Sequence, residues 1–494
     1  MVNLVQFPSP QKARSRGRGF ITVEILIALA LLVVSLSSMV ILGFGSQSLS
    51  VDSSTSDEAL NLAIEQLDAA RITPFNSIVS TSTITGIYTK ELIVKNYDCL
   101  KHVTSTLTWL RDNRPQFVTL DTYVSNPPEA FRFGGDCRIG FPNFWTNPGT
   151  YDSADIHPGG NNGTDIDMQR VNGTRYVFLS SHHSSEENSD LWIYDLSQLN
   201  NPILVNSSDT GEGLFALDSA KIGSNYYVFA AQNDSNNQLQ IINVTNPASP
   251  TIIAEQKLQG VGNPNPEGWS IRFYENYIYV GTRQTNGDEL QIYDVSVPSN
   301  PSLAGKYSVN QDVQDIQVRN ENINGVTMTI AYLGLSGVGT TKEIQILDVT
   351  NPSSITKLTD INLPGNETVN TISLSGNRMY LGRDRSSSYQ ELYVYDISSP
   401  SSPILLGSSD VDLNSNSGVT NILVLKNFLF MGTNDPNDEF QVWDVVNPAN
   451  LIRYSTFNFP QEITGLDYVD DIVVVSVKSN DAFHSIYDQD NPPQ

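Results

Sequence analysis

The sequence predicts two units: an α+β unit with a long N-terminal helix and a small antiparallel sheet, followed by an all-β, seven-bladed β-propeller. Three observations lead to this prediction. Near the start of the 494-residue chain, a basic segment gives way to an apolar run. Short alternating segments separated by turn residues follow it. A motif with a period of about 40–50 residues then recurs to the end of the chain.

The composition favours a β-rich protein that works outside the cytoplasm. Charged residues make up only 16% of the chain, whereas Asn, Ser, Thr, Gly and Pro are abundant. Because the net charge is −25, nucleic acid is not expected as a partner of the propeller. The two cysteines, Cys99 and Cys137, are read most simply as one disulfide of an exported chain, with two buried free thiols as the alternative.

The N-terminal segment has the composition of a membrane-entering segment. Residues 1–19 carry four basic residues and no acid, and residues 25–44 carry no charge. An uncharged run of about 20 residues can span a bilayer as a helix, and the basic flank keeps the N-terminus in the cytoplasm. Glu24 stands at the start of this run, where a carboxylate costs on the order of 3 kcal/mol. Its presence therefore needs a physical reason.

The stretch "RGRGFITVE" supplies one, because it places Gly19 directly before Phe20, with Glu24 as the fifth residue counted from Phe20. This stretch resembles the type IV prepilin signal. In that family a membrane prepilin peptidase cuts after the glycine, the new N-terminal residue is commonly methylated, and the glutamate pairs with the N-terminal amine of a neighbouring subunit. The resemblance implies a leader over 1–19, cleavage between Gly19 and Phe20, and an assembly role for Glu24. An ordinary secretory signal and an uncleaved anchor are the alternatives.

The helix is expected to continue beyond the membrane as a stem over residues 20–72, with its second half packed on a head domain. Apolar residues recur there at helical spacing: Leu60, Ala63, Ile64 and Leu67. Residues 73–138 then hold "ELIVKNYDCLKHV", "STLTWLRDN" and "QFVTLDTYVSN", which alternate or are rich in β-branched residues. They predict a small antiparallel sheet against the stem, similar to minor pilins, with Cys137 placed to tie the tail of this head to Cys99.

The chain after residue 160 is built from copies of an internal repeat. Its clearest line is a short strand ending in Asp or Asn, as in "LQIYDVSVPSNP", "LYVYDISSPSSP" and "FQVWDVVNPANL". Seven copies end at Asp195, Asn243, Asp294, Asp348, Asp396, Asp444 and Asp488, spaced 44 to 54 residues apart. With the other strand segments, each unit holds four short strands, which is the signature of a propeller blade. The strands resemble those of the LVIVD-repeat propellers.

Two details of the repeat carry structural predictions. The Asp or Asn ends a strand, where its side chain can accept a backbone N–H of the following turn, so a structural role is predicted for it rather than a metal-binding one. The seventh copy stops without a fourth strand and leaves an open edge. A segment within 139–160 is expected to supply that strand, so that 139–165 is a linker with a closing strand and 166–494 is the propeller.

The loops between the second and third strands vary from repeat to repeat, unlike the repetitive "NPSSP" turns. Variable polar loops on a rigid scaffold are where binding usually resides. Arg283, Arg383, Arg385 and Asp435 lie in these loops and are the candidate ligand face for an extracellular protein or glycan. Solvated turns without a binding role are the alternative.

No motif specifies a reaction, a cofactor or a metal site. His182 and His183 precede Glu186 and Glu187, but adjacent residues of a strand point to opposite faces. The stretch "DVDLNSNSG", which begins at Asp410, lacks the sixth-position glycine and the twelfth-position glutamate of a calcium-binding loop. The protein is therefore not expected to be an enzyme.

Together these features predict a minor type IV pilin, or a pilus-tip-like subunit, that displays its propeller at the cell surface for adhesion or ligand binding. Before assembly it would cross the inner membrane once, with its C-terminal domain outside the cytoplasm. Its partners would be the prepilin peptidase and other pilin subunits. A pseudopilin of a type II secretion or DNA-uptake machine and a membrane-anchored extracellular propeller enzyme are the alternatives.

Overall fold

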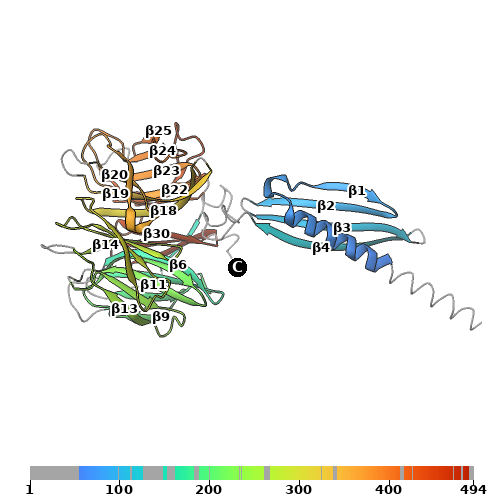
Figure 1. The fold of residues 1–494 in the computed structure, drawn as a ribbon, viewed down its shortest axis with the longest axis horizontal. Helices are drawn as coiled ribbons and strands as arrows, with labels where there is room; N and C mark the ends of the chain where they lie inside the picture. The colour runs from blue at the N-terminus through green and yellow to red at the C-terminus, as the bar shows by residue number, and fades with distance from the viewer. Residues whose placement is uncertain are drawn as a thin grey trace, which may run out of the picture. The chain divides into compact units, whose positions relative to one another are not determined.

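The chain folds into two compact units, Met1–Pro127 and Pro128–Gln494 (Figure 1). The computed structural model describes residues 55–97, 100–111, 114–125, 148–152, 162–182, 189–199, 201–232, 234, 236–260, 267–323, 325–337, 342–411, 417–425, 427–470, 472–479 and 482–488. The predicted cleavage, assembly and disulfide residues lie outside this part of the chain: Gly19, Phe20, Glu24, Cys99 and Cys137. Residues 20–54 of the predicted stem lie outside it too. Among the described residues, no helix is both long enough and apolar enough to cross a membrane.

In the described part of the first unit, a helix is joined to a sheet. The helix covers residues 55–72 and leads through the short 3-10 helix η1, Phe75–Ser77, into a four-stranded antiparallel meander. The strands of the meander are β1 (Thr81–Thr85), β2 (Tyr88–Tyr97), β3 (Leu100–Arg111) and β4 (Arg114–Ser125). They pair in chain order, so a helix followed by a small antiparallel sheet is found where the sequence predicted it.

The helix packs on the sheet through small residues. Its buried stripe follows the spacing of a helix face and consists of Ala59, Ala63, Leu67 and Ala70. Ala59 and Ala63 contact Tyr88, Leu107 and Trp109 of the sheet, because alanine lets the helix backbone approach these larger side chains. Leu60 and Ile64, which are also part of the apolar spacing that predicted the helix, lie off this stripe, with exposed fractions of 39% and 43%.

The described residues of the second unit form seven four-stranded antiparallel sheets, which is the arrangement of a β-propeller. The first blade holds β6 (Asn162–Val171), β7 (Thr174–His182), β8 (Leu191–Asp195) and β9 (Ile203–Ser208). The second holds β10 (Leu214–Ile222), β11 (Asn225–Gln232), β12 (Leu239–Asn243) and β13 (Thr251–Gln256). The third holds β14 (Gly268–Tyr274), β15 (Tyr277–Thr282), β16 (Leu290–Asp294) and β17 (Ser302–Tyr307).

The remaining blades repeat the same order. The fourth holds β18 (Val313–Ile323), β19 (Val326–Leu335), β20 (Ile344–Asp348) and β21 (Thr356–Ile361), with the 3-10 helix η3 (Pro352–Ser354) before β21. The fifth holds β22 (Val369–Ser375), β23 (Arg378–Arg383), β24 (Leu392–Asp396) and β25 (Ile404–Ser409). The sixth holds β26 (Val419–Leu425), β27 (Phe428–Thr433), β28 (Phe440–Asp444) and β29 (Ile452–Phe457).

The seventh blade is completed by a strand from before the first one. Its own strands are β30 (Ile463–Val469), β31 (Ile472–Val477) and β32 (Phe483–Asp488), and its fourth strand is β5 (Pro148–Asp152). β5 runs antiparallel to β32, with Thr150 opposite Ile486, and it lies within the stretch that the sequence pattern indicated. Side chains also join the last blade to the first, since the Thr464 hydroxyl donates to the Gly163 carbonyl and the Asp467 carboxylate accepts from the Met168 N–H.

Apolar side chains fill the space between neighbouring blades. One core cluster joins Tyr279 and Ile292 of the third blade to Ile316 and Leu333 of the fourth. The recurring glycine of "VGT", "LGR" and "MGT" lets the next blade come close: a Cβ added to Gly382 would meet Val419 at 2.3 Å. The glycine of the repeat is thus a packing requirement between blades.

The repeated Asp and Asn residues stabilise turns, as predicted. The side chain of Asp294 accepts the backbone N–H of Ser296 at 2.8 Å, and the same contact, to the residue two positions on, recurs in five other copies. Those copies are Asp195, Asn243, Asp348, Asp396 and Asp444. The bond from Ser398 lowers the pKa of Asp396, because it favours the charged carboxylate.

Candidate functional site

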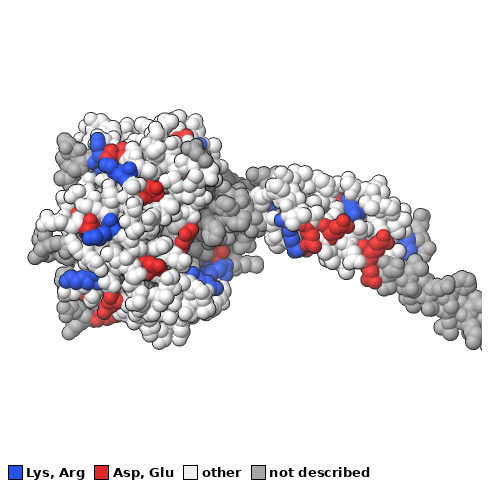
Figure 2. Space-filling view, in the orientation of Figure 1, with Lys and Arg blue, Asp and Glu red and all other residues white. Residues whose placement is uncertain are grey.

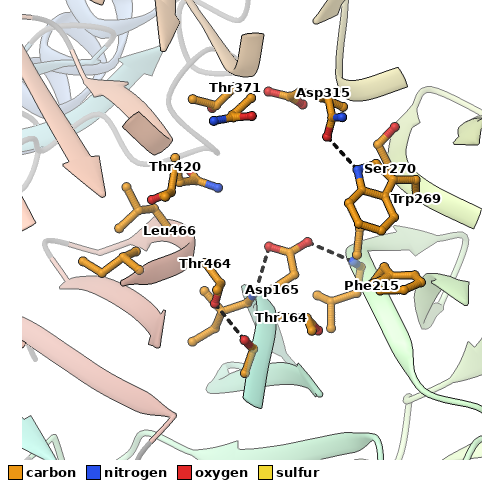
Figure 3. Close-up of a pocket in the computed structure, with 18 of the residues that line it drawn as sticks. Thr164, Asp165, Phe215, Trp269, Ser270, Asp315, Thr371, Thr420, Thr464 and Leu466 are labelled. Atoms are coloured by element: carbon orange, nitrogen blue, oxygen red, sulfur yellow. Dashed lines mark hydrogen bonds between the residues drawn. The ribbon is translucent and has the colours of Figure 1, made fainter. Parts of the chain in front are cut away.

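The first strands of the seven blades surround a central cavity of about 620 Å³ (Figure 3). Two positions of the repeat supply most of its rim. The residue at or just after the end of the second strand lines the cavity in four blades: His182, Asp384, Asn434 and Lys478. The residue two positions before the repeated Ile or Leu lines it in every blade: Thr164, Phe215, Trp269, Gln314, Asn370, Thr420 and Thr464. The cavity therefore opens where the first strands begin and the second strands end, beside the variable loops.

Aromatic rings cover one wall of the cavity. The Phe215 ring stacks on the His182 ring with centroids 5.0 Å apart, and it lies 4.6 Å from the Trp269 ring. The Trp269 indole N–H donates to the Gln314 side-chain oxygen at 2.7 Å. The guanidinium of Arg283 lies over the same indole, 4.1 Å from the ring centroid. Figure 3 shows Phe215 and Trp269 side by side on this wall.

Polar side chains on the opposite wall are held by hydrogen bonds. The Asn370 amide donates both to the Asp384 carboxylate at 2.8 Å and to the Val419 carbonyl at 2.9 Å. The Asn434 side-chain oxygen accepts the Gly418 N–H at 2.7 Å. These amides come from the fifth and sixth blades, whereas the aromatic wall comes from the first three. Their fixed orientation means that little conformational entropy would be lost when a ligand binds.

Carboxylates form the deeper part of the cavity and bind the neighbouring blade. Asp165 accepts the backbone N–H of Leu217, and Asp315 accepts that of Ile372. Asp218 accepts the N–H of Phe273 and lies 3.8 Å from the guanidinium of Arg272. Figure 3 shows the Asp165 carboxylate directed into the cavity. These acids therefore stabilise contacts between blades as well as lining the cavity with carboxyl groups.

Burial perturbs the titration of these carboxylates. Burial raises the pKa of Asp165 to about 7, although the backbone N–H groups of Leu217 and Ile166 act in the opposite direction. Burial also raises the pKa of Asp467 to about 6, and burial together with the nearby Asp467 raises the pKa of Asp167 well above its ordinary value. The low-dielectric surroundings thus outweigh the hydrogen bonds that favour the charged forms.

The four residues that the sequence assigned to a ligand face do not form one surface in the structure. Arg283 does not line the cavity itself but lies over Trp269, which does, and its carboxylate partner Glu267 lies 3.1 Å away. Arg385 is exposed on the loop after β23 and does not line the cavity. Arg383 is buried, with its side chain 1% exposed, and it donates to the carbonyls of Pro364 and Gln390.

Asp435 is buried too, and it accepts the N–H of Asn437 in its own turn. The cavity residues are instead the immediate neighbours of Arg383 and Asp435, namely Asp384 and Asn434. Because successive residues of a strand point to opposite sides, a shift of one position exchanges a buried side chain for a lining one. Phe215 and Trp269 were not singled out from the sequence, although "FAL" and "WSI" display an aromatic residue at the same position of the repeat.

Within the described part of the chain, no group of three or more His, Cys, Asp or Glu side chains has a geometry that could hold a metal ion. Several residues that were considered for such a site lie outside the described residues: His183, Glu186, Glu187, Asp412 and Asn414.

Three stretches of the propeller match the LVIVD repeat family: 224–255, 267–309 and 368–411. The chain contains LVIVD repeats. The matches fall in the second, third and fifth blades and cover the strand ending in Asp or Asn in each. The predicted resemblance of the strand sequences to LVIVD repeats is therefore confirmed for these blades.

Solved structures of low identity also resemble the chain. A chain of the mitotic checkpoint complex is 11% identical with a TM-score of 0.45, covering 68% of this chain and 95% of that one. The WD40 β-propeller domain of Doa1 is 14% identical with a TM-score of 0.46, covering 69% of this chain and 98% of that one. No curated protein matches the chain in sequence.

Proposed function

We propose that this protein is a minor type IV pilin, or a pilus-tip-like subunit, whose extracellular β-propeller binds a surface or a ligand for adhesion. The observation that carries the proposal is the N-terminal motif: a basic leader, Gly19 before Phe20, Glu24 at the fifth position, and an uncharged run over 25–44. Cleavage after Gly19 would create an amine on Phe20. A charge in an apolar surrounding is tolerated when it is paired, so this amine gives Glu24 a partner in the next subunit.

The order of helix and sheet in the first unit supports the proposal. A helix packed on an antiparallel meander is the order expected of a pilin head, and residues 55–72 and β1–β4 have that order. Leu60 and Ile64 are partly exposed on the helix, on a different side from the buried alanine stripe. In a filament, such residues would be available to a neighbouring stem.

The cavity of the propeller supports a binding role. It is lined by amides, hydroxyls, carboxylates and aromatic rings, which is the mixture of groups that small-molecule and surface recognition use. On the face of the molecule in Figure 2, basic and acidic side chains of the described residues are interspersed. The proposed partners are other pilin subunits and the prepilin peptidase at the N-terminus, and an extracellular protein or glycan at the propeller.

Mass spectrometry of the mature N-terminus tests the pilin part of the proposal. The expected first residue is Phe20, carrying a methyl group. A mature membrane form that keeps Met1 would contradict the pilin assignment and favour an uncleaved anchor. Purification of the surface filament, or of the secretion or uptake complex that contains the protein, would then separate a pilus subunit from a pseudopilin.

Glu24→Ala tests the assembly role. The variant should be cleaved and exported normally but should be depleted from sheared filaments, because the amine of the neighbouring subunit loses its partner. Glu65→Ala is the matched control, since Glu65 is an exposed glutamate of the helix over 55–72. Normal incorporation of Glu24→Ala, measured by immunoblot of the filament fraction, would count against the proposal.

A further inference from the structure

We propose that the central cavity of the propeller is a saccharide-binding site that accepts neutral or amino sugars and rejects acidic ones. This inference rests on the proposed adhesive function and deepens it, because it names the place and the chemical class of the ligand. It moves the binding site from the outer loops to the cavity that the loops surround.

The aromatic wall provides the surface on which a sugar ring can pack. The C–H faces of a pyranose are apolar, while its hydroxyls are polar, and aromatic side chains offer a rigid apolar surface with little conformational entropy to lose. Trp269 is held by Gln314 through its indole N–H and by Arg283 over one face, so its orientation is fixed before a ligand arrives. Phe215 extends the same wall and is itself held by His182.

The opposite wall provides directional hydrogen bonds. Asn370, Asp384 and Asn434 line the cavity. The Asn370 amide donates a hydrogen bond to the Asp384 carboxylate, and the Asn434 side-chain oxygen accepts one from a backbone N–H. Amides and carboxylates each offer several donor or acceptor sites, so a partner already bound leaves capacity for a hydroxyl group. A polar wall facing an aromatic wall suits a ligand with polar edges and an apolar face, and a saccharide has this chemistry.

The size and charge of the cavity narrow the ligand class. Its volume of about 620 Å³ lies within the range of small-molecule sites, about 300–1,000 Å³. Acids outnumber bases in the lining, with Arg272 and Lys478 as its basic residues besides His182. The Lys478 ammonium is held by Glu462 at 2.5 Å, and Arg272 lies near Asp218. Because both of these basic side chains already have an acidic partner, a carboxylate or sulfate on a sugar would find no unpaired cation in them, whereas a hydroxyl or an amine can bond to the acidic side chains of the lining.

An array of immobilised oligosaccharides tests this inference on the full-length protein. It should hold neutral hexoses, N-acetylated and free amino sugars, and sialylated or sulfated chains, and hits should be measured again by isothermal titration. The expected result is binding of neutral or amino sugars with weaker or absent binding of the acidic chains. Trp269→Ala and Phe215→Ala should each weaken binding about tenfold or more, because a stacked ring contributes on the order of 1.4 kcal/mol.

Two further variants keep the test interpretable. Tyr389→Ala is the matched control, because Tyr389 is an exposed aromatic residue of the β23–β24 loop that does not line the cavity. The saccharide affinity of this variant should equal that of the wild type. Trp269→Phe keeps an aromatic ring and should keep part of the affinity if Trp269→Ala fails to fold. Thermal unfolding of each variant identifies folding defects.

The outcomes separate this inference from the proposed function. Saccharide binding that survives Trp269→Ala and Phe215→Ala in folded protein would overturn the cavity site while leaving an adhesive propeller. Preference for acidic chains would overturn the charge argument and with it the proposed class. Absence of any saccharide binding, with attachment to cells or matrix retained, would overturn this inference and leave a protein ligand for the proposed function. Absence of every attachment would overturn both.

Discussion

At the scale of single residues, a buried acceptor before the third strand connects each of the first six blades to the loop that follows that blade. Glu289 accepts the backbone N–H groups of Val309 and Asn310 at 2.8 and 2.9 Å. The corresponding residue in other blades makes the same contact with the N–H twenty positions on: Asp190, Gln238, Glu343, Glu391 and Glu439. The sequence shows this acceptor in the first six repeats, whereas the seventh has Ala482 at the same position, and its role becomes visible only when the loop is seen to return to it.

Replacing Glu289 tests how much one such acceptor contributes. Glu289 is buried and also accepts the N–H of Thr285, so Glu289→Ala leaves three N–H groups without their partner and should lower the free energy of unfolding by about 1–3 kcal/mol. Glu289→Gln should cost less, because a carboxamide oxygen still accepts a bond. The second blade offers the precedent, since Gln238 makes this contact there.

Urea unfolding of the three proteins, followed by circular dichroism, provides the measurement. If Glu289→Ala unfolded at the same urea concentration as the wild type, the contact would be dispensable. If Glu289→Gln were as unstable as Glu289→Ala, the negative charge rather than the acceptor oxygen would carry the effect.

At the rim of the cavity, the sequence predicted the correct loops but not which of their side chains line the cavity. The sequence located the binding face on the loops after the second strands, and Asp384 and Asn434 lie there. It assigned their neighbours Arg383 and Asp435 instead, because a composition of charged residues does not tell which side of the strand end each side chain occupies. That side is set by the register with the first strand, in which Arg383 pairs with Val369.

At the scale of elements, the closure of the ring depends on β5. This strand covers the edge of β32, with Thr150 opposite Ile486 and Tyr151 opposite Ser485. An uncovered edge would expose backbone N–H and C=O groups to other chains. The element was predictable because the seventh repeat lacked a strand, and its position was predictable because the ends of a closed ring must meet.

Proline substitutions in β5 test this closure. The double variant Thr150→Pro/Tyr151→Pro removes the N–H group of whichever residue faces β32, so the pairing should fail. The expected result is a lower thermal midpoint and the appearance of dimers or larger species in size-exclusion chromatography with light scattering. Thr150→Val/Tyr151→Val is the control and should behave as the wild type, because valine favours strands. A monomeric proline variant of unchanged midpoint would show that β5 does not hold the ring closed.

The helix over 55–72 shows a second limit at this scale. Its type and position followed from apolar spacing, but the buried face did not, because Leu60 and Ile64 have the same spacing as Ala59 and Ala63. The sheet decides between the two stripes: Tyr88 and Trp109 fill the space, and only alanine leaves room for them. The large side chains of the sheet therefore decide which face of the helix is buried, although the leucine and isoleucine of the other face are more hydrophobic than alanine.

At the scale of the whole molecule, the buried carboxyls of the propeller predict that stability falls as the pH rises. Burial raises the pKa of Asp165, Asp190 and Glu391 to about 7 and that of Asp467 to about 6. A carboxyl whose pKa is raised by folding binds protons more tightly in the folded state. Its stabilising contribution is complete below its unfolded pKa, about 4, and is lost as the pH rises through about 6–7.

Thermal unfolding between pH 5 and pH 8 checks this prediction. The midpoint should be highest near pH 5 and should fall by a few degrees toward pH 8. Asp190→Asn should flatten this dependence, because the amide keeps an acceptor oxygen for the Thr210 N–H and does not titrate. A midpoint that rises from pH 5 to pH 8 would show that the carboxyls ionise at their ordinary pKa in the folded protein.

The sequence by itself determined the features that depend on local pattern and on repetition. These are the helix before a small sheet, the number of blades, the turn-forming Asp and Asn, and the need for a closing strand. Each follows from neighbouring residues or from counting repeats, which the linear order of the chain preserves.

Only the tertiary structure decided which side chains share the central cavity. Phe215, Trp269 and Asn370 come from three different blades, and they meet because the first strands converge on one axis. The same convergence buries Arg383, directs Asp384 to the rim, and brings acids of separate repeats close enough to raise one another's pKa. Distance between residues of different repeats is set by the closure of the ring, and the linear order of the chain does not contain it.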